Sequence, residues 1–474
     1  MCTRTHCTPK RKSSPWTGKE TDYKVSGGTD LWSDRISFGR KAKEGIVASR
    51  IDNPNDHGES VVPTSFLNPR QPWQGRRIVL GVTGSIAAYK AVSIARSLTS
   101  LGAEVDTILT DGASHFVCPI SFEGVTGRRS SSDLFSVNNT ALHISLGIEA
   151  DVVCIAPATA DFIARVSLGR ANDLLSTTLL ATKAPVIVCP AMNTNMYLHT
   201  QTQKNLKYLK DQLSYTVAGP AEGPLAHGEN EGLGRMLEPD EIIEEIGKAL
   251  VGPSPLTGRE VLVTAGPTEE PIDPVRFISN RSSGRMGFAI AQAAHRLGAS
   301  VRLISGPVAL PDPYGVDVVR VTTAKEMLAS VLDFLPKADV TVFAAAVSDY
   351  GVANVSTEKI KRSQGNTPPN LDLMENPDIV LDTLDIRKEK SITVGFALET
   401  ESLLENAREK LERKQFDFVV ANSASEKGAG FDVETNRVTL LFPSGRNKEV
   451  PLMSKHDVSE VIMSQILELL SNQS

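Results

Sequence analysis

The sequence predicts an α/β protein with two tandem doubly wound parallel-sheet domains behind a polar N-terminal extension. Two observations predict this fold class. Short, mostly apolar runs alternate with helical stretches in both halves of the chain, as expected for strands that a parallel sheet buries on both faces. The alternation breaks at Gly252-Pro253-Ser254-Pro255 and then begins again with a new strand and a new glycine-containing turn.

The extension covers residues 1–74, which are polar and lack both helical and strand periodicity. We expect it to be disordered, and a start codon assigned too far upstream would give the same composition. Trp16, Trp32 and Trp73 all fall in it, outside both predicted cores. The N-terminus has no apolar stretch behind its positive charges, which argues against a secretory signal, whereas an organellar transit peptide stays open.

The composition of the chain excludes several classes of function. The 474 residues are 41% hydrophobic and 22% charged, enough for two full cores, and the formal net charge of −6 argues against a general nucleic-acid binder. No apolar run is long enough to cross a bilayer. Among the five cysteines, Cys154 and Cys189 lie in apolar runs, and no spacing indicates a metal site or a disulfide framework. These features predict a cytoplasmic protein with no nucleic-acid or membrane partner.

The first domain is predicted over 75–252 and the second over 253–474. In the first, strands are expected at 77–82, 104–109, 151–156 and 185–189, with helices at 87–95 and 161–166. In the second, strands are expected at 259–264, 300–304, 340–345, 393–396 and 418–421, with a closing helix at 455–470. Ligands of such sheets bind beyond the carboxyl ends of the strands.

The first candidate site is the turn that contains Gly84 and Ser85, between a strand and a helix. Glycine lets the backbone approach a phosphate, and the free N–H groups of a helix start add donors. A plain tight turn with Ser85 as a helix cap explains the same residues. The turn lacks the GxGxxG spacing of a dinucleotide site, which disfavours an NAD-dependent enzyme.

Several separated motifs make the first domain resemble the flavoprotein phosphopantothenoylcysteine decarboxylases, and hence a flavodoxin/Rossmann-like fold. They are Gly84 to Lys90, Leu142 to Leu146, Ala156 to Ala160, Gly169 to Leu174, and Pro190 to Met196. The resemblance implies that FMN is held by four residues of two turns, Gly84, Ser85, Ala158 and Thr159.

The same resemblance implies that His143 is the catalytic base and that Asn193 and Met196 contact the substrate near its carboxylate, with Asn193 also catalytic. Each residue has a structural explanation as well. His143 could be a satisfied histidine at a helix start, Asn193 could cap a turn, and Met196 could belong to the core.

The sequence departs from that family at His227, where many relatives carry a cysteine in a substrate-covering flap. His227 could supply the last proton, because imidazolium titrates near neutral pH, or it could be a neutral replacement. The second option leaves open a flavin domain that is degenerate or regulatory beside an active ligase.

The stretch from Asn280 to Gly287 offers two hydroxyls, a glycine and a helix start, which suits an anion or merely a capped helix entry. Together with Ala344 to Tyr350, Glu358 to Arg362, Glu375 to Asp378 and Val394 to Thr400, it makes the second domain resemble phosphopantothenate–cysteine ligase. That family joins 4′-phosphopantothenate to cysteine with CTP, through an acyl-cytidylate.

This resemblance implies roles in nucleotide chemistry. Asn280 would be catalytic and position the acyl group, and Asp349 would help to hold Mg²⁺. The CTP site would comprise Ser282, Ser283 and Gly284 on the triphosphate, Ala345 and Phe396 in the nucleotide pocket, and Asp349, Lys359 and Lys361. A solvated loop is the alternative for the two lysines.

The two resemblances together predict a bifunctional enzyme of coenzyme A biosynthesis, whose partners are 4′-phosphopantothenate, cysteine and CTP. Because relatives form trimers through the flavin domain and dimers through the ligase domain, a closed homo-oligomer is expected.

Overall fold

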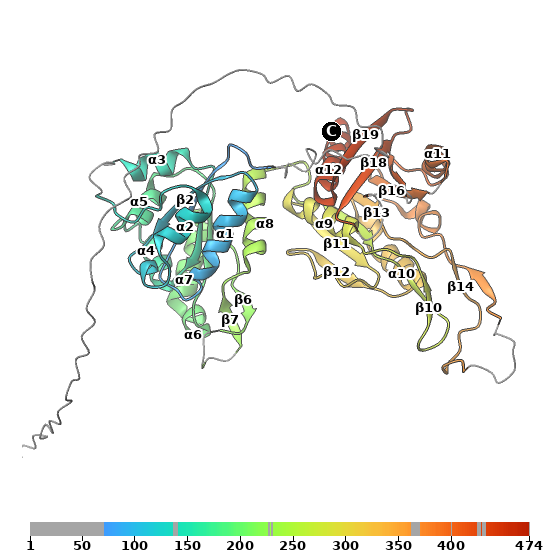
Figure 1. Cartoon of the computed structure of the whole chain (residues 1–474), viewed down its shortest axis with the longest axis horizontal. Helices are drawn as coiled ribbons and strands as arrows, with labels where there is room; N and C mark the ends of the chain where they lie inside the picture. The colour runs from blue at the N-terminus through green and yellow to red at the C-terminus, as the bar shows by residue number, and fades with distance from the viewer. Residues whose placement is uncertain are drawn as a thin grey trace, which may run out of the picture. The chain divides into compact units, whose positions relative to one another are not determined.

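The computed structural model describes residues 71–135, 141–225, 228, 231–361, 370–399, 401–423, 428 and 433–473. All of them belong to one compact unit, Asn68–Ser474. His227 and most of the predicted extension, residues 1–70, lie outside the described residues. Both described domains are α/β, as the sequence predicts (Figure 1).

The first domain is built on a parallel sheet with the strand order β2-β1-β3-β4-β5. Its strands are β1 (Arg77–Val82), β2 (Glu104–Leu109), β3 (Val152–Ala158), β4 (Val186–Pro190) and β5 (Thr216–Val217). A separate antiparallel hairpin joins β6 (Ala221–Gly223) to β7 (Gly232–Arg235). Its helices are α1 (Ala88–Ser100), α2 (Pro119–Thr126), α3 (Leu142–Glu149), α4 (Ala160–Ser167), α5 (Leu174–Ala181), α6 (Thr194–Leu198), α7 (Thr200–Asp211) and α8 (Pro239–Val251).

Alternation along β1 divides the core of this domain between the two faces of the sheet. Ile78 and Leu80 pack in a cluster that includes Ile94 of α1. Val79 points the other way, into a cluster that includes Phe162 of α4. The strand is therefore buried on both faces, which is why its sequence reads as a continuous apolar run.

Trp73 corrects the predicted limit of the extension. Its side chain is only 9% exposed and belongs to the core cluster of the first domain, where it lies against Gly247 of α8. The Trp73 backbone N–H also donates to the Leu101 carbonyl at 3.0 Å. Hydrophobic periodicity does not reveal that Trp73 belongs to the core, because a single buried aromatic residue forms no repeating pattern.

The second domain has a larger sheet with the order β12-β11-β8-β13-β16-β17-β18-β19. The strands are β8 (Glu260–Ala265), β11 (Ser300–Ser305), β12 (Asp317–Arg320), β13 (Val340–Phe343), β16 (Ile392–Glu399), β17 (Phe418–Ser423), β18 (Thr435–Leu441) and β19 (Asn447–Ser454). Two small ribbons pair β9 (Glu269–Pro271) with β10 (Phe277–Ser279) and β14 (Tyr350–Val352) with β15 (Leu373–Glu375). The helices are α9 (Arg285–Arg296), α10 (Ala324–Phe334), α11 (Leu403–Arg413) and α12 (Lys455–Asn472).

The edge formed by β18 and β19 departs from the expected parallel arrangement. Both strands pair antiparallel, β18 with β17 and β19 with β18. A tight turn joins them, in which Gly445 has a φ of 82° and the Phe442 N–H donates to the Arg446 carbonyl at 3.1 Å. Antiparallel neighbours need only such a turn, whereas every parallel pair needs a crossover. The sheet is therefore mixed at this edge and parallel elsewhere.

Candidate active sites

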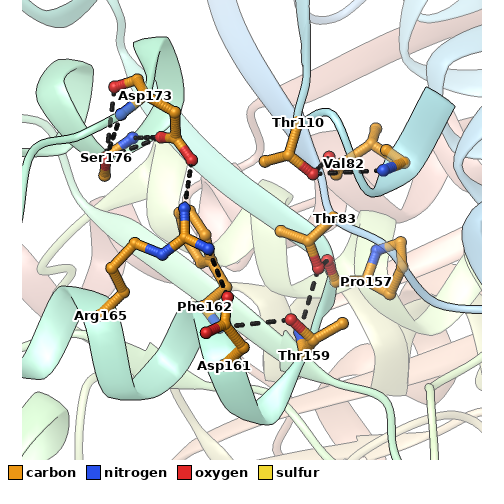
Figure 2. Close-up of polar contacts among 11 residues, drawn as sticks. Val82, Thr83, Thr110, Pro157, Thr159, Asp161, Phe162, Arg165, Asp173 and Ser176 are labelled. Carbon is orange, nitrogen blue, oxygen red and sulfur yellow. Dashed lines mark hydrogen bonds and ion pairs between the residues drawn. The ribbon is translucent and has the colours of Figure 1, made fainter.

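The turns after β1 and β3 are joined through one buried side chain, Thr83 (Figure 2). Its hydroxyl donates to the Pro157 carbonyl at 2.8 Å and accepts from the Thr159 N–H at 3.0 Å. Thr159 in turn caps α4, because its hydroxyl accepts from the Phe162 N–H at 3.3 Å. The two turns predicted to hold FMN are thus brought side by side at the carboxyl edge of the sheet.

Gly84 allows a third turn to approach the same edge. A Cβ at Gly84 would lie 2.9 Å from the Gly112 backbone, which follows β2, so no side chain fits there without displacing that backbone. Ser85 is not the helix cap that the alternative required, because α1 begins at Ala88 with Ala87 in the capping position. The Ser85 hydroxyl accepts from the Ala87 N–H at 3.3 Å.

The Gly169 to Leu174 motif has a structural role in the described residues. Asp173 caps α5 by accepting from the Ser176 N–H at 2.7 Å, and its other oxygen accepts from Arg165 at 2.6 Å. Arg165 also pairs with Asp161 in the first turn of α4 (Figure 2). This network holds α4 against α5. Because Thr159 caps α4, the network also helps to fix the position of the Thr159 turn.

His143 and Asn193 both lie at helix starts, which the structural explanations of these residues also expect, and their catalytic roles stay predictions. His143 lies in the first turn of α3, and its Nδ1 is buried with no hydrogen-bond partner among the described residues. An unpartnered buried nitrogen is costly unless a ligand or water satisfies it. Asn193 caps α6 through its Oδ1, which accepts from the Asn195 N–H at 2.8 Å. Met196 is half exposed rather than a core residue.

The β6–β7 hairpin is anchored next to Asn193. The Met192 N–H donates to the Gly234 carbonyl at 3.0 Å, and a Cβ on Gly234 would lie 2.1 Å from the Met192 oxygen. Only glycine permits this contact, and its φ of 143° is one that other residues rarely adopt. The predicted flap therefore starts from strands that touch the proposed substrate-binding turn, although its His227 lies outside the described residues.

These residues fit an FMN. Three turns meet at one sheet edge with two hydroxyls, those of Ser85 and Thr159. Elsewhere in the domain, on α3, a buried imidazole nitrogen has no partner among the described residues. A phosphate suits hydroxyls and backbone N–H groups at helix starts. The assignment of each residue to the cofactor stays a prediction.

The second domain contains a cavity of about 630 Å³, within the range of ligand sites. Five of the residues predicted to bind CTP line it, namely Ser282, Ser283, Gly284, Asp349 and Phe396. Asn280, which is predicted to be catalytic, lines it as well. Gly284 has a φ of 73° and precedes α9, so the hydroxyls lie at a helix N-terminus. Ala345 does not line the cavity, although Ala344 and Ala346 do. The Ala345 N–H instead donates to the Thr264 hydroxyl at 3.2 Å.

Asn280 connects two of the predicted motifs. Its amide nitrogen donates to the carbonyls of Ala346 and Val347 at 3.1 and 3.0 Å. Asn376 makes a similar connection, since its amide donates to the Ser348 carbonyl at 2.9 Å. These bonds hold the segment that contains Asp349 against the cavity.

Sequence reasoning missed the cationic wall of this cavity. Its cations are Lys410, Arg413, Lys414 and Lys455, from α11, the residue after it and the start of α12. The acidic Glu399 and Glu409 line the same cavity. Burial, with the neighbouring charge of Lys414, lowers the pKa of Lys410 to about 8. The Lys410 ammonium donates to the Phe396 carbonyl at 2.6 Å. An α-helix brings residues four apart to one face, and the spacing of Lys410 and Lys414 is the sequence signal that could have identified this pair.

Lys414 pairs with Asp378 of the Glu375 to Asp378 motif at 2.7 Å. Burial alone would raise the pKa of Asp378, but the Lys414 ammonium outweighs it and holds that pKa below its usual value. Asp378 therefore stays ionised and fixes Lys414 at the rim of the cavity.

Lys359 and Lys361 do not line the cavity. They flank Ile360, which Asp273 and Arg276 hold by both backbone groups: the Ile360 N–H donates to Asp273 at 3.1 Å and its carbonyl accepts from Arg276 at 2.6 Å. The Asp273 side chain is fully buried, and its bond to Arg276 drives its pKa far below the usual value. The two lysines thus lie beside a fixed point, and residues 362–369 that follow are outside the described residues.

Two features are absent from the described residues. No group of three or more His, Cys, Asp or Glu side chains there could hold a metal ion by itself. No helix of that part of the chain is long and apolar enough to span a membrane.

Two family models match this chain. Residues 67–251 match "Flavoprotein", and residues 256–470 match "DNA/pantothenate metabolism flavoprotein C-terminal domain". A curated relative from Vibrio vulnificus, "Coenzyme A biosynthesis bifunctional protein CoaBC", is 42% identical over 85% of this chain and 100% of its own length. The Escherichia coli protein with the same description is 43% identical over 83% and 97%. A solved C-terminal domain of such a protein is 37% identical, with a TM-score of 0.40, over 46% of this chain and 99% of that one.

Proposed function

This chain belongs to the family of coenzyme A biosynthesis bifunctional proteins, and we propose how its two domains divide the work. The second domain couples 4′-phosphopantothenate to cysteine with CTP. The first then decarboxylates phosphopantothenoylcysteine to 4′-phosphopantetheine with FMN. This division is supported by the 630 Å³ cavity of the second domain, which Ser282 and Ser283 line together with the residues of the cationic wall. Such a wall suits a triphosphate.

In the ligase half, Ser282, Ser283 and Gly284 bind the triphosphate at the start of α9, and Lys410 and Lys414 neutralise it from the cationic wall. Asp349, together with phosphate oxygens, holds Mg²⁺, which commonly relies on one or two carboxylates and the substrate. Asn280 orients the acyl group. Its two bonds to Ala346 and Val347 carbonyls fix the amide, so that its Oδ1 is the atom available to substrate.

In the decarboxylase half, bound FMN supplies the two-electron chemistry that makes loss of carbon dioxide possible. The chain's own residues orient and move protons. His143 accepts a proton at its unpartnered Nδ1, and Asn193 and Met196 orient the substrate carboxylate. His227, which falls between β6 and β7 in the sequence, donates the last proton, and the Gly234 carbonyl of β7 accepts from the Met192 N–H.

The assembly is proposed to be a closed homo-oligomer with flavin-domain trimers joined by ligase-domain dimers. Large apolar side chains are exposed on the first domain, including Ile144 and Ile148 on α3 and Leu180 on α5. Elements α3 and α5 pack together, so these residues favour burial against another copy. A cytoplasmic location also stays a prediction.

The test is one incubation of the purified chain with 4′-phosphopantothenate, cysteine, CTP and Mg²⁺, followed by mass spectrometry. We expect 4′-phosphopantetheine, inorganic pyrophosphate and CMP, with ATP a poor substitute for CTP. Phosphopantothenoylcysteine as the final product would contradict the decarboxylase half. Equal use of ATP would contradict the assignment of the cavity to CTP.

A further inference from the structure

Lys90 is a buried charged residue that the proposed chemistry does not use. It lies in the first turn of α1, close in sequence to the Gly84-Ser85 turn, and its side chain is only 9% exposed. Burying a lysine ammonium is unfavourable unless it finds partners. Its partners come from about 150 residues further along the chain, at the junction between β7 and α8, as sequence separations of 146 and 148 show.

The junction holds the ammonium with two groups. Lys90 donates to the Met236 carbonyl at 3.3 Å and to the Glu238 carboxylate at 2.9 Å. Glu238 is also paired with Arg235, the last residue of β7. Burial by itself would raise the pKa of Glu238, but Lys90 and then Arg235 hold it below its usual value, so the carboxylate stays ionised.

The same junction reaches the substrate side of the domain. Gly234 precedes Arg235 and makes the close contact with Met192 already described, next to Asn193. Arg235 also lies over Gly223 on the partner strand β6, where a Cβ would be 3.0 Å from its guanidinium. One end of this chain of contacts is therefore the helix after the cofactor turn, and the other is the turn that carries Asn193.

We propose that Lys90 is a positioning residue of the decarboxylase half: by tying α1 to the β7–α8 junction, it fixes the Met192–Asn193 turn at the distance from the cofactor that the substrate carboxylate requires. The inference rests on the proposed function of this domain. Lys90 touches neither substrate nor cofactor in this assignment. It acts through the backbone of β7.

Replacement of Lys90 leaves no unpaired buried charge. Glu238 is 46% exposed and keeps Arg235, so the Lys90→Met variant is expected to fold with its flavin. Misplacement of an orienting group by about 1 Å can reduce catalysis by about 100-fold. We therefore expect the KM for phosphopantothenoylcysteine to rise by about tenfold in Lys90→Met, with a smaller change in kcat.

The experiment compares Lys90→Met, Lys90→Arg and Lys207→Met in the full chain. Lys207 is a matched control, because its ammonium pairs with Asp211 at an exposed position of α7 rather than with a residue of the junction. Flavin content, the visible spectrum and the ligase rate are measured for each variant beside the decarboxylase KM and kcat. We expect a raised KM only in Lys90→Met, with partial recovery in Lys90→Arg and unchanged flavin content throughout.

The outcomes separate the inference from the proposed function. A wild-type chain that does not decarboxylate phosphopantothenoylcysteine contradicts the function itself. An active wild type with an unaltered KM in Lys90→Met overturns the positioning role. Loss of flavin, or an equal loss of kcat and ligase rate, would show that Lys90 only stabilises the fold and would also overturn it.

Discussion

The two candidate sites draw their functional groups from different parts of similar sheets. At the first site, the residues proposed for the cofactor and substrate lie at strand ends and in the first turns of the helices that follow, as Thr159 and Asn193 do. At the second, residues of such turns share the lining of the cavity with residues from the body of α11 and the start of α12. A flavin phosphate can be bound largely by backbone N–H groups at the edge of a sheet, whereas a triphosphate also needs several cationic side chains.

Loss of His143 should produce the largest effect at the first site. Without a base, proton removal has no acceptor, and His143→Ala should lower the decarboxylation rate by about 1,000-fold, within the range for general acid–base catalysis. The variant should remain yellow and keep its ligase rate, because the cavity of the second domain contains no residue of α3. Carbon dioxide release is the measurement.

The control for that variant is His115→Ala, which removes an exposed imidazole from the same domain. Both variants should bind flavin alike. Normal carbon dioxide release from His143→Ala would remove His143 from the mechanism and leave its buried Nδ1 without an explanation.

Replacement of Asn280 tests the second site in the same way. In Asn280→Asp the group at this position no longer donates, so the bonds to the Ala346 and Val347 carbonyls are lost and a carboxylate faces them. Each lost bond contributes about 0.5–1.5 kcal/mol, so losing both should lower the ligase rate by about 10- to 100-fold. We expect pyrophosphate release to continue while coupling to cysteine stalls.

Added phosphopantothenoylcysteine provides the internal control, since the first domain of Asn280→Asp should decarboxylate it at the wild-type rate. Full product from 4′-phosphopantothenate at the normal rate would show that the assigned role of Asn280 is wrong.

The fold and most turn residues were predictable because their signals are local. The strand predicted at 77–82 and the observed β1 (Arg77–Val82) have the same bounds. A strand that is buried on both faces forms one nearly continuous apolar run, so its ends are easy to locate in the sequence. The edge strand β19 was missed because it buries few of its side chains. The neighbouring β18 was missed although it is largely buried, because polar residues such as Asn436 and Arg437 interrupt its apolar pattern. Lys410 was missed because an amphipathic helix rich in Lys and Glu reads as a solvated surface until the sheet beside it is known.

Lys410 allows the cationic wall to be tested by pH. Burial lowers its pKa to about 8, so the ammonium that we place on the triphosphate is present below that pH and lost above it. For a group on the free enzyme, kcat/KM follows its titration. We therefore expect kcat/KM for CTP to be level below pH 8 and to fall above it, and Lys410→Arg to remove that fall.

Lys410→Met should behave at neutral pH as the wild type does at high pH. One lost charge-assisted contact contributes about 1.5–3 kcal/mol, so kcat/KM for CTP should fall by about 10- to 100-fold. A pH profile shared by the wild type and Lys410→Arg would mean that another group titrates there.

The smallest effect is expected from Asp273, which acts on the second site only through Ile360. In Asp273→Asn the charge on Arg276 loses its buried partner, while an amide oxygen can still accept from the Ile360 N–H. Lys359 and Lys361 then lose part of their fixed position, and the KM for CTP should rise by about three- to tenfold, as for one weakened hydrogen bond.

Asp312→Asn is the matched control, because Asp312 pairs with Arg320 at an exposed position of the same domain. Initial rates at varied CTP, with melting temperatures for both variants, make the comparison. A KM that stays at the wild-type value, with the melting temperature alone lowered, would mean that Asp273 stabilises the loop without placing its lysines on the nucleotide.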